Sequence, residues 1–267
     1  MQLELIHAPA QGQARPVKLL FVHGICTGAW VWEQHFLPYF AGLGYESYAV
    51  SLRGHGKSEG REKIRQFELA DFAEDVDWAV KQIGGPVVVT GHSLGGAVVQ
   101  NYVKRGGEAA GVVLFCSVPP HGLLRAAIAM QTKNPALARE LRKALLLGLR
   151  GADLDEIEAG LFAHPPSPEL RRMLFERMDD IAEAASKQAM GWPPFAPFPW
   201  GMPKLLVTGG DRDEFVPEGD VRMTAIYYGA RAVIVRGGAH AMMMDTNWRD
   251  AAGPIGDWLQ ETFGGRL

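Results

Sequence analysis

A short glycine-rich turn at residues 87–96 constrains this chain more than any other feature of its sequence. Val-Val-Val-Thr predicts a buried strand, Gly-His-Ser-Leu-Gly follows it, and the next residues have the pattern of a helix. A serine at the tip of so sharp a turn has a strained backbone, and side chains at the flanking positions would clash, so both positions must be glycine. The turn therefore predicts that the Ser93 hydroxyl stands above the edge of a sheet and that the Leu94 N–H begins a helix.

Strand and helix patterns alternate on both sides of this turn. Up to about residue 120, short apolar runs rich in β-forming residues alternate with amphipathic helical stretches, and the alternation resumes after residue 200. The expected strands are 18–22, 45–50, 86–90, 111–116, 204–208 and 232–235, and the expected helices are 71–83, 94–105, 218–227 and 248–263. This alternation predicts an α/β fold with a mostly parallel, doubly wound sheet.

The strand pattern is interrupted between residues 121 and 200. Helix-forming stretches at 136–149 and 168–189 are followed by a segment at 191–200 that is rich in Pro, Trp and Phe. Because the strand pattern resumes afterwards, we expect an inserted helical cap, or lid, at 121–200 on a core formed by residues 1–120 and 201–267. Trp192 and Trp200 are expected to brace the cap where it rejoins the core.

Charge and composition argue against several classes of protein. The net charge of −3 and the lack of a long Lys/Arg run argue against a nucleic-acid partner. The first residues do not resemble a signal peptide, and no apolar run reaches the ~18 residues that a bilayer span needs, so we expect a cytoplasmic protein with no membrane partner. Cys26 and Cys116 show no metal-ligand spacing, which predicts neither a disulfide framework nor a zinc site.

A serine hydroxyl needs a base, and that base needs a carboxylate to orient it. Of eight histidines, His240 lies in a loop directly after the last expected strand, from which its ring can turn back toward Ser93. The strand at 204–208 ends in a turn with three acidic residues, of which Asp213 is favoured as the orienting carboxylate and Asp211 as a cap of the turn. The order serine, aspartate, histidine along the chain is the one expected for a serine on a strand-to-helix turn.

A second N–H donor for an oxyanion is expected in His-Gly-Ile at residues 23–25, directly after the strand at 18–22. The Ile25 N–H would face the Leu94 N–H, and Gly24 would allow the close backbone approach. His23 itself is expected to brace this loop. We expect the substrate pocket between sheet and cap, lined by residues that include Trp30, Val118 and His23.

Together these motifs resemble the α/β-hydrolase superfamily. The resemblance is carried by His-Gly at 23–24, Ser-Leu-Arg-Gly-His-Gly-Lys-Ser at 51–58, Gly-His-Ser-Leu-Gly-Gly at 91–96, the Asp213 turn and Gly-Ala-His at 238–240. It implies a sheet of α/β-hydrolase type and a serine hydrolase. Ser93 argues against the epoxide and haloalkane hydrolases of this superfamily, which place Asp at that position.

Residues 23–32 resemble more particularly the plant methylesterase and hydroxynitrile lyase branch, which implies small esters or cyanohydrins. Those lyases typically carry Thr where this chain has Gly24 and Lys where it has Ala241, so hydrolysis is preferred to lyase chemistry. Arg53 and His55 belong to a motif that is commoner in bacterial esterases, lysophospholipases and C–C hydrolases. We expect these two residues to fix their loop, with contact to substrate as the alternative.

We therefore expect a serine esterase that cleaves a small or medium, largely uncharged carboxylic ester through an acyl-enzyme. Ser93, His240 and Asp213 would form the triad, and Ile25 and Leu94 the oxyanion hole, with no metal or other cofactor. A C–C bond hydrolase, a lactonase or a thioesterase would use the same three residues and remains an alternative. A ligand receptor that retains the triad is the alternative outside enzymes.

Overall fold

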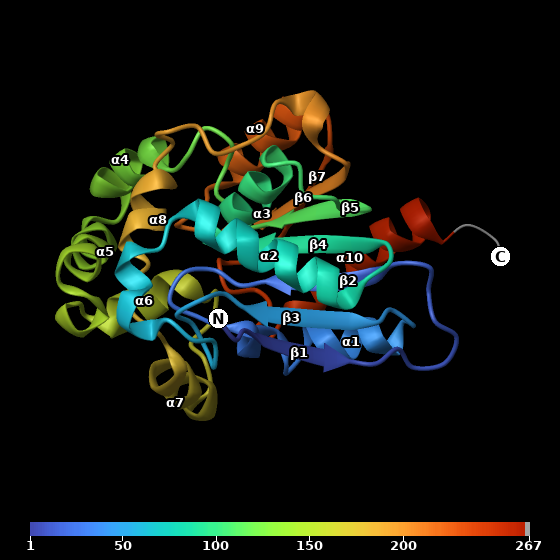
Figure 1. The fold of residues 1–267 in the computed structure, drawn as a ribbon. Helices are drawn as coiled ribbons and strands as arrows, with labels where there is room; N and C mark the ends of the chain where they lie inside the picture. Colours follow the sequence, from blue (N-terminus) through green and yellow to red (C-terminus); the bar gives the residue numbers. More distant parts are fainter. Residues whose placement is uncertain (265–267) are drawn as a thin grey trace.

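The computed structural model describes residues 1–264, and one seven-stranded sheet runs through it (Figure 1). The strand order is β1-β3-β2-β4-β5-β6-β7, with β1 antiparallel to β3 and every other pair parallel. Figure 1 shows helices on both faces of the sheet and a group of short helices beyond one end of it. The α/β fold with a mostly parallel, doubly wound sheet is thus confirmed.

The elements of the sheet and its two covering layers correspond closely to the patterns in the sequence. The strands are β1 Glu4–Ala8, β2 Lys18–Val22, β3 Ser47–Ser51, β4 Val87–His92, β5 Gly111–Phe115, β6 Lys204–Gly210 and β7 Arg231–Val235. The helices are α1 Phe36–Gly42, α2 Leu69–Ile83, α3 Leu94–Lys104, α9 Glu218–Tyr228 and α10 Trp248–Phe263. β1 was not expected, because this edge strand is only half-buried and therefore has a weak apolar pattern.

Side chains of each central strand alternate between two hydrophobic cores, one on each face of the sheet. In β2, Leu20 and Val22 enter the core that α2, α3 and α9 cover, whereas Leu19 and Phe21 enter the core beneath α1 and α10. β4 and β5 are buried along their whole length. Strands covered on both faces must be apolar throughout, which explains the continuous valine and leucine runs in these segments.

The chain between β5 and β6 folds into five α-helices and two short 3-10 helices, and the α-helices lie beyond the carboxyl ends of the parallel strands (Figure 1). These α-helices are α4 Leu124–Lys133, α5 Pro135–Leu147, α6 Leu154–Leu161, α7 Pro168–Arg177 and α8 Glu183–Gln188. Leu137, Ile157 and Met130 form a small core among them, and Cys26 from the loop after β2 completes it. The cap helices therefore pack directly on a loop of the sheet.

The helix expected at 168–189 is interrupted at residues 178–182. There the Asp179 N–H donates to the Cys26 carbonyl (2.9 Å), and the buried Asp179 carboxylate accepts from the Gly56 N–H (2.7 Å). The segment leaves the helical conformation because its backbone and side chain bind two loops of the core. Asp179 thus joins the cap to both loops, through its backbone N–H to one and through its buried carboxylate to the other.

Trp192 and Trp200 do not brace the cap, so that expectation was wrong. Each is 82% exposed, and Phe195 is instead the aromatic side chain that this segment buries. The Tyr227 hydroxyl on α9 donates to the Pro197 carbonyl at 3.3 Å and helps to fix the segment. In the part of the chain that the structure describes, no helix combines the length and the apolar character that a bilayer crossing requires.

The start of α3 tolerates no added side chain, which gives a test of the packing. A Cβ at Gly95 would lie 2.2 Å from the His23 carbonyl oxygen, whereas a Cβ at Gly219 in the first turn of α9 would meet no atom within 4 Å. We expect Gly95→Ala to lower the free energy of unfolding by ~1–3 kcal/mol. The matched control Gly219→Ala should raise it by ~0.4–1 kcal/mol. Urea unfolding followed by circular dichroism measures both, and equal changes in the two variants would contradict this packing.

Candidate active site

Ser93 lies between β4 and α3 in a strained backbone conformation. Its φ of 53° and ψ of −120° lie in a region that residues other than glycine rarely adopt. A Cβ at Gly91 would lie 2.5 Å from the Gly95 carbonyl oxygen, so the first turn of α3 is pressed directly against the end of β4. The half-buried Ser93 side chain consequently stands above the carboxyl edge of the sheet.

Two residues from neighbouring strand ends complete a hydrogen-bonded chain with Ser93. His240 lies in the loop after β7, and Asp213 in the loop after β6. The Ser93 Oγ is 2.9 Å from His240 Nε2, and His240 Nδ1 is 2.8 Å from Asp213 Oδ2. With Nδ1–H donating to the carboxylate, Nε2 is left to accept the serine proton. The structure therefore brings together the three residues that the sequence analysis proposed as a triad.

The two aspartates of the loop after β6 have different partners. Asp213 Oδ1 accepts from the Phe215 and Val216 N–H groups at 2.8 and 2.9 Å, which leaves Oδ2 for His240. Asp211 accepts from the Gly237 N–H at 2.7 Å. Asp213 thus orients the His240 ring, while Asp211 holds the loop that carries His240.

The Ile25 N–H belongs to the loop after β2 and the Leu94 N–H directly follows Ser93, and both residues line a cavity with Ser93. Among the hydrogen bonds formed within residues 1–264, neither group donates to a protein acceptor. Leu94 is the first residue of α3, where helix geometry leaves the N–H free. Both groups are thus available to an anionic oxygen at Ser93.

His23 supports the loop that carries the Ile25 N–H. Its Nδ1–H donates to the Gly24 carbonyl at 2.7 Å, and its Nε2 accepts from the Leu52 N–H at 2.9 Å. Burial lowers the pKa of His23 well below its usual value, and the nearby His55 lowers it further. A neutral ring with both nitrogens occupied fixes the loop and has no free site for a proton.

Two cavities open from Ser93 beneath the cap. The larger, of about 300 Å³, extends between α4, α5 and α8, and the smaller, of about 110 Å³, extends toward α6, α7 and the residues after His240. The residues that line both are Ile25, Ser93, Leu141, Ile181 and Phe215. A further surface depression lies at the opposite, amino-terminal edge of the strands, against Pro86, Ala110 and Pro203, far from the Ser93 loop.

The substrate-pocket residues proposed from sequence have different positions. Val118 lines the larger cavity. Trp30 and His23 line neither cavity: Trp30 is buried in the core beneath α1, with the Arg177 guanidinium 5.0 Å from its ring centroid, and His23 lies under its own loop. Sequence reasoning missed Phe215, which the loop after β6 places beside Asp213 and stacks on His240, and Ile181, which only the packing of the cap brings to Ser93.

Comparison with known proteins identifies the family of this chain. A family model described as the alpha/beta hydrolase family matches residues 19–252. The chain belongs to this family. Human protein ABHD8 is 26% identical over 254 residues, which cover 88% of this chain and 53% of the human protein. The chain spans about half the length of the ABHD8 proteins that it matches.

Solved structures of an esterase and of a lipase have the same fold. The esterase EaEST from Exiguobacterium antarcticum superposes with a TM-score of 0.69 at 15% identity, covering 98% of this chain and 96% of the esterase. The monoacylglycerol lipase from Paleococcus ferrophilus superposes with a TM-score of 0.69 at 19% identity, covering 98% of this chain and all of the lipase. At such identities the likeness establishes the shared fold.

The other histidines near the site of this α/β hydrolase are held neutral. The His92 Nε2–H donates to the His240 carbonyl at 2.9 Å, and burial lowers the pKa of His92 well below its usual value. Burial also lowers the pKa of His55 to about 4. Burial raises the pKa of the Cys26 and Cys116 thiols, which disfavours the thiolate form. His240 is therefore the basic group positioned to take the Ser93 proton.

His92, Cys116 and His240 place possible ligand atoms within 4.8 Å of one another. His240 uses both ring nitrogens for Ser93 and Asp213, and His92 uses Nε2 for the His240 carbonyl. In this cluster His92 therefore holds the backbone of His240 in place. A metal ion bound there would compete with the hydrogen bonds of His240 to Ser93 and Asp213.

Arg53 and His55 both serve the loop after β3. The Arg53 side chain donates to the buried Asp75 at 2.8 Å and also contacts Asp71. The His55 Nδ1–H donates to the Arg53 carbonyl at 3.1 Å, and the ring is buried beside His23. Neither side chain lines the two cavities.

The buried neutral histidines predict a loss of stability in mild acid. The pKa of His55 is about 4 in the fold and near 6.5 without burial. Between these values the unfolded chain binds the extra proton, so the free energy of unfolding should fall as the pH falls from 6.5 to 4. The fall is up to about 1.4 kcal/mol per pH unit for one such histidine. Above pH 6.5 this contribution is constant.

Urea unfolding at a series of pH values, with His55→Gln as the comparison, measures this effect. The variant should lose the part of the slope that His55 contributes. Equal slopes in the two proteins would show that His55 titrates in the same way in the folded and unfolded chains.

Proposed function

We propose that this chain is a serine esterase acting on small or medium, largely uncharged carboxylic esters. The observation that carries the proposal is the aligned chain Ser93–His240–Asp213, with Nε2 of His240 2.9 Å from the serine oxygen and the Asp213 side chain fully buried. The esterase and the monoacylglycerol lipase that share this fold support ester chemistry.

In the first half of the proposed reaction, His240 takes the Ser93 proton as Oγ attacks the ester carbonyl carbon. The carbonyl π electrons move onto oxygen, and the Ile25 and Leu94 N–H groups stabilise the resulting anion. One such donor contributes about 3–4 kcal/mol in other serine hydrolases. The C–O bond to the alcohol then breaks, and His240 returns the proton to the departing oxygen.

In the second half, water replaces the alcohol. His240 takes a proton from the water molecule as its oxygen attacks the acyl-enzyme, and the same two N–H groups stabilise the second anion. Collapse of this intermediate breaks the bond to Oγ, and His240 reprotonates Ser93. Asp213 stabilises the imidazolium in both halves without taking up a proton.

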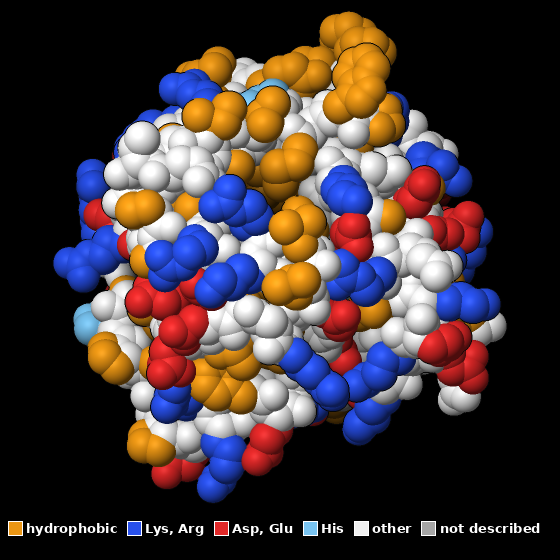
Figure 2. Space-filling view, turned by 90° about the vertical axis from the view of Figure 1, so that its left-hand side faces the viewer, with side chains coloured by type: hydrophobic (Ala, Val, Ile, Leu, Met, Phe, Trp, Pro, Cys, Tyr) orange, Lys and Arg blue, Asp and Glu red, His pale blue; other side chains and the backbone are white. Residues whose placement is uncertain are grey.

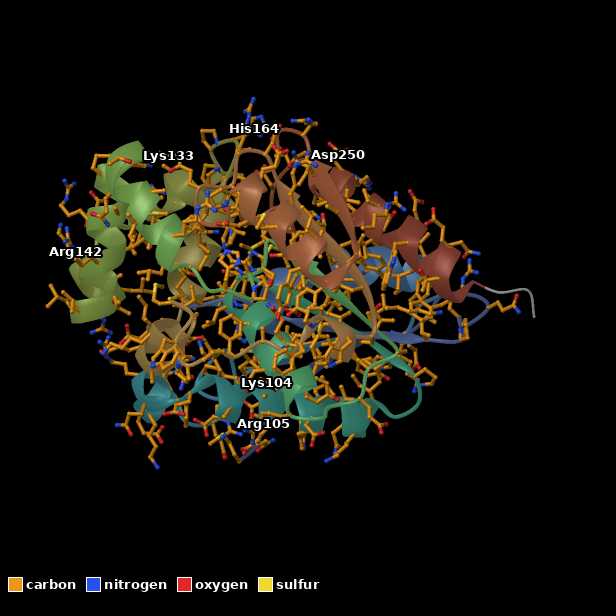
Figure 3. The ribbon with its side chains drawn as sticks, turned by 90° about the horizontal axis from the view of Figure 1, so that it is seen from above. Lys104, Arg105, Lys133, Arg142, His164 and Asp250 are labelled. Carbon is orange, nitrogen blue, oxygen red and sulfur yellow. The ribbon has the colours of Figure 1, made fainter. Side chains whose placement is uncertain are left out.

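The preference for uncharged substrates follows from the lining of the two cavities. Alanine, leucine, isoleucine and methionine side chains dominate both walls, and an unpaired charge buried among them would be costly. Arg142, the charged residue that lines the larger cavity, is exposed. Figure 3 shows it on α5 at the outer side of the cap.

Ser93→Ala should abolish steady turnover of p-nitrophenyl acetate while leaving the melting temperature within a few degrees of the wild type. The reason is that the acyl-enzyme cannot form without Oγ. Full activity in this variant would refute the proposal. A fluorophosphonate probe should label the wild-type protein at Ser93 and leave the variant unlabelled.

Parallel assays with lactones and thioesters distinguish an esterase from other hydrolases that use the same triad. A single turnover, after which the protein is not regenerated, would indicate a receptor.

Asp213→Asn and Asp211→Asn form a matched pair within one loop. Asparagine at 213 favours the wrong tautomer of His240, and the corresponding change in another triad lowers kcat by about 10⁴-fold. Asparagine at 211 keeps an acceptor for the Gly237 N–H, so we expect a change in kcat of less than about tenfold. Comparable losses in the two variants would contradict the assignment of Asp213.

A further inference from the structure

The proposed reaction determines which side of Ser93 receives the alcohol. The tetrahedral carbon carries the Ser93 oxygen, the oxyanion, the alcohol oxygen and the acyl chain. The oxyanion faces the Ile25 and Leu94 N–H groups. The alcohol oxygen must lie within reach of His240 Nε2, which gives it a proton. The acyl chain therefore takes the remaining direction.

Only one of the two cavities is lined by His240. The smaller cavity has His240, Ala241, Met243 and Met244 in its wall. The wall of the larger cavity contains Leu94, Val118 and residues of α4, α5 and α8, and does not include His240. The alcohol oxygen therefore leads into the smaller cavity, and the acyl chain leads into the larger one.

The sizes of the cavities limit the two halves of the substrate. An apolar cavity of about 150 Å³ holds a benzene ring of six carbons. By that measure the smaller cavity, at about 110 Å³, holds an alkyl group of about four carbons, and the larger, at about 300 Å³, holds a chain of up to about twelve.

The two cavities differ in whether their walls reach the surface of the protein. Cap residues such as Ala144, Ile157 and Leu174, all buried, close the smaller cavity. The larger cavity includes the exposed Gln131 and Arg142 on α4 and α5. Figure 2, which views the cap end, shows apolar side chains interspersed with Lys and Arg on this face. A longer acyl chain can thus extend toward solvent beside these polar residues.

On these grounds, and on the proposed esterase function, we infer that the substrates are short-chain alkyl esters of medium-chain apolar carboxylic acids. The larger cavity binds the acyl chain, and the smaller cavity binds an alcohol of about one to four carbons.

Two isomeric esters test the inference on the wild-type protein. Methyl octanoate and heptyl acetate have the same atoms and nearly the same apolar surface, but they distribute the carbons oppositely about the ester bond. We expect kcat/KM, measured by pH-stat titration, to be at least about tenfold higher for methyl octanoate, since rejecting a single methylene can already change kcat/KM by about tenfold. Equal values, or a preference for heptyl acetate, would overturn the inference.

Two variants test separately which cavity binds the alcohol and which binds the acyl chain. Ala144 lines the smaller cavity and Ala126 the larger, and both are buried. Ala144→Leu should lower kcat/KM for butyl acetate relative to methyl acetate and leave the ratio of methyl octanoate to methyl acetate unchanged. Ala126→Leu should do the reverse. Melting temperatures verify that both variants fold, and the opposite pattern would exchange the two assignments and overturn the inference.

Failure of the inference and failure of the proposed function are distinguishable. If neither ester is hydrolysed and a fluorophosphonate does not label Ser93, the esterase proposal fails. If esters are hydrolysed without the predicted preference, the esterase proposal stands and the assignment of the cavities fails.

Discussion

The left-handed backbone at Ser93 is the constraint on which the rest of the site depends. It is possible only because Gly91 and Gly95 leave room for α3 to begin directly against β4. The strain raises Oγ above the sheet edge and, in the same turn, leaves the Leu94 N–H free. Since β4, β6 and β7 are parallel, their carboxyl ends meet at this edge, and loops distant in sequence deliver Asp213 and His240 to one serine.

Several residues hold His240 in place without taking part in the proposed reaction. Asp211 holds the backbone of the loop that presents His240, and the neutral His92 binds the His240 carbonyl from below. The position of the His240 ring is thus fixed by three contacts: His92 binds the backbone carbonyl of His240, Asp211 holds its loop, and Asp213 binds its Nδ1. Such redundancy suits a residue that changes charge in each half of the proposed reaction, because the position of His240 does not depend on one hydrogen bond.

The sheet and the hydrogen-bonded arrangement of Ser93, His240 and Asp213 could be predicted from sequence because local rules determine them. Gly-x-Ser-x-Gly defines its own turn, and Asp213 and His240 each follow an apolar strand directly. The cap could not be predicted to the same depth. The break at 178–182 depends on the Cys26 carbonyl and the Gly56 N–H, more than a hundred residues away, and nothing within 168–189 encodes those partners. Apolar character alone likewise did not reveal that Trp192 is exposed.

The aromatic ring of Phe215 has a consequence for how such an enzyme can change in evolution. Phe215 stacks on His240 at 4.7 Å between centroids and forms part of both cavity walls. Residues of α4 touch one cavity, and those of α6 and α7 touch the other. Under the proposed esterase function, substitutions within α4, α6 or α7 can therefore change the fit of one half of the ester without altering Ser93, His240 or Asp213. A change at Phe215 would alter the surroundings of His240 and both cavity walls together, because Phe215 stacks on the His240 ring and, like the cap residues Leu141 and Ile181, lines both cavities.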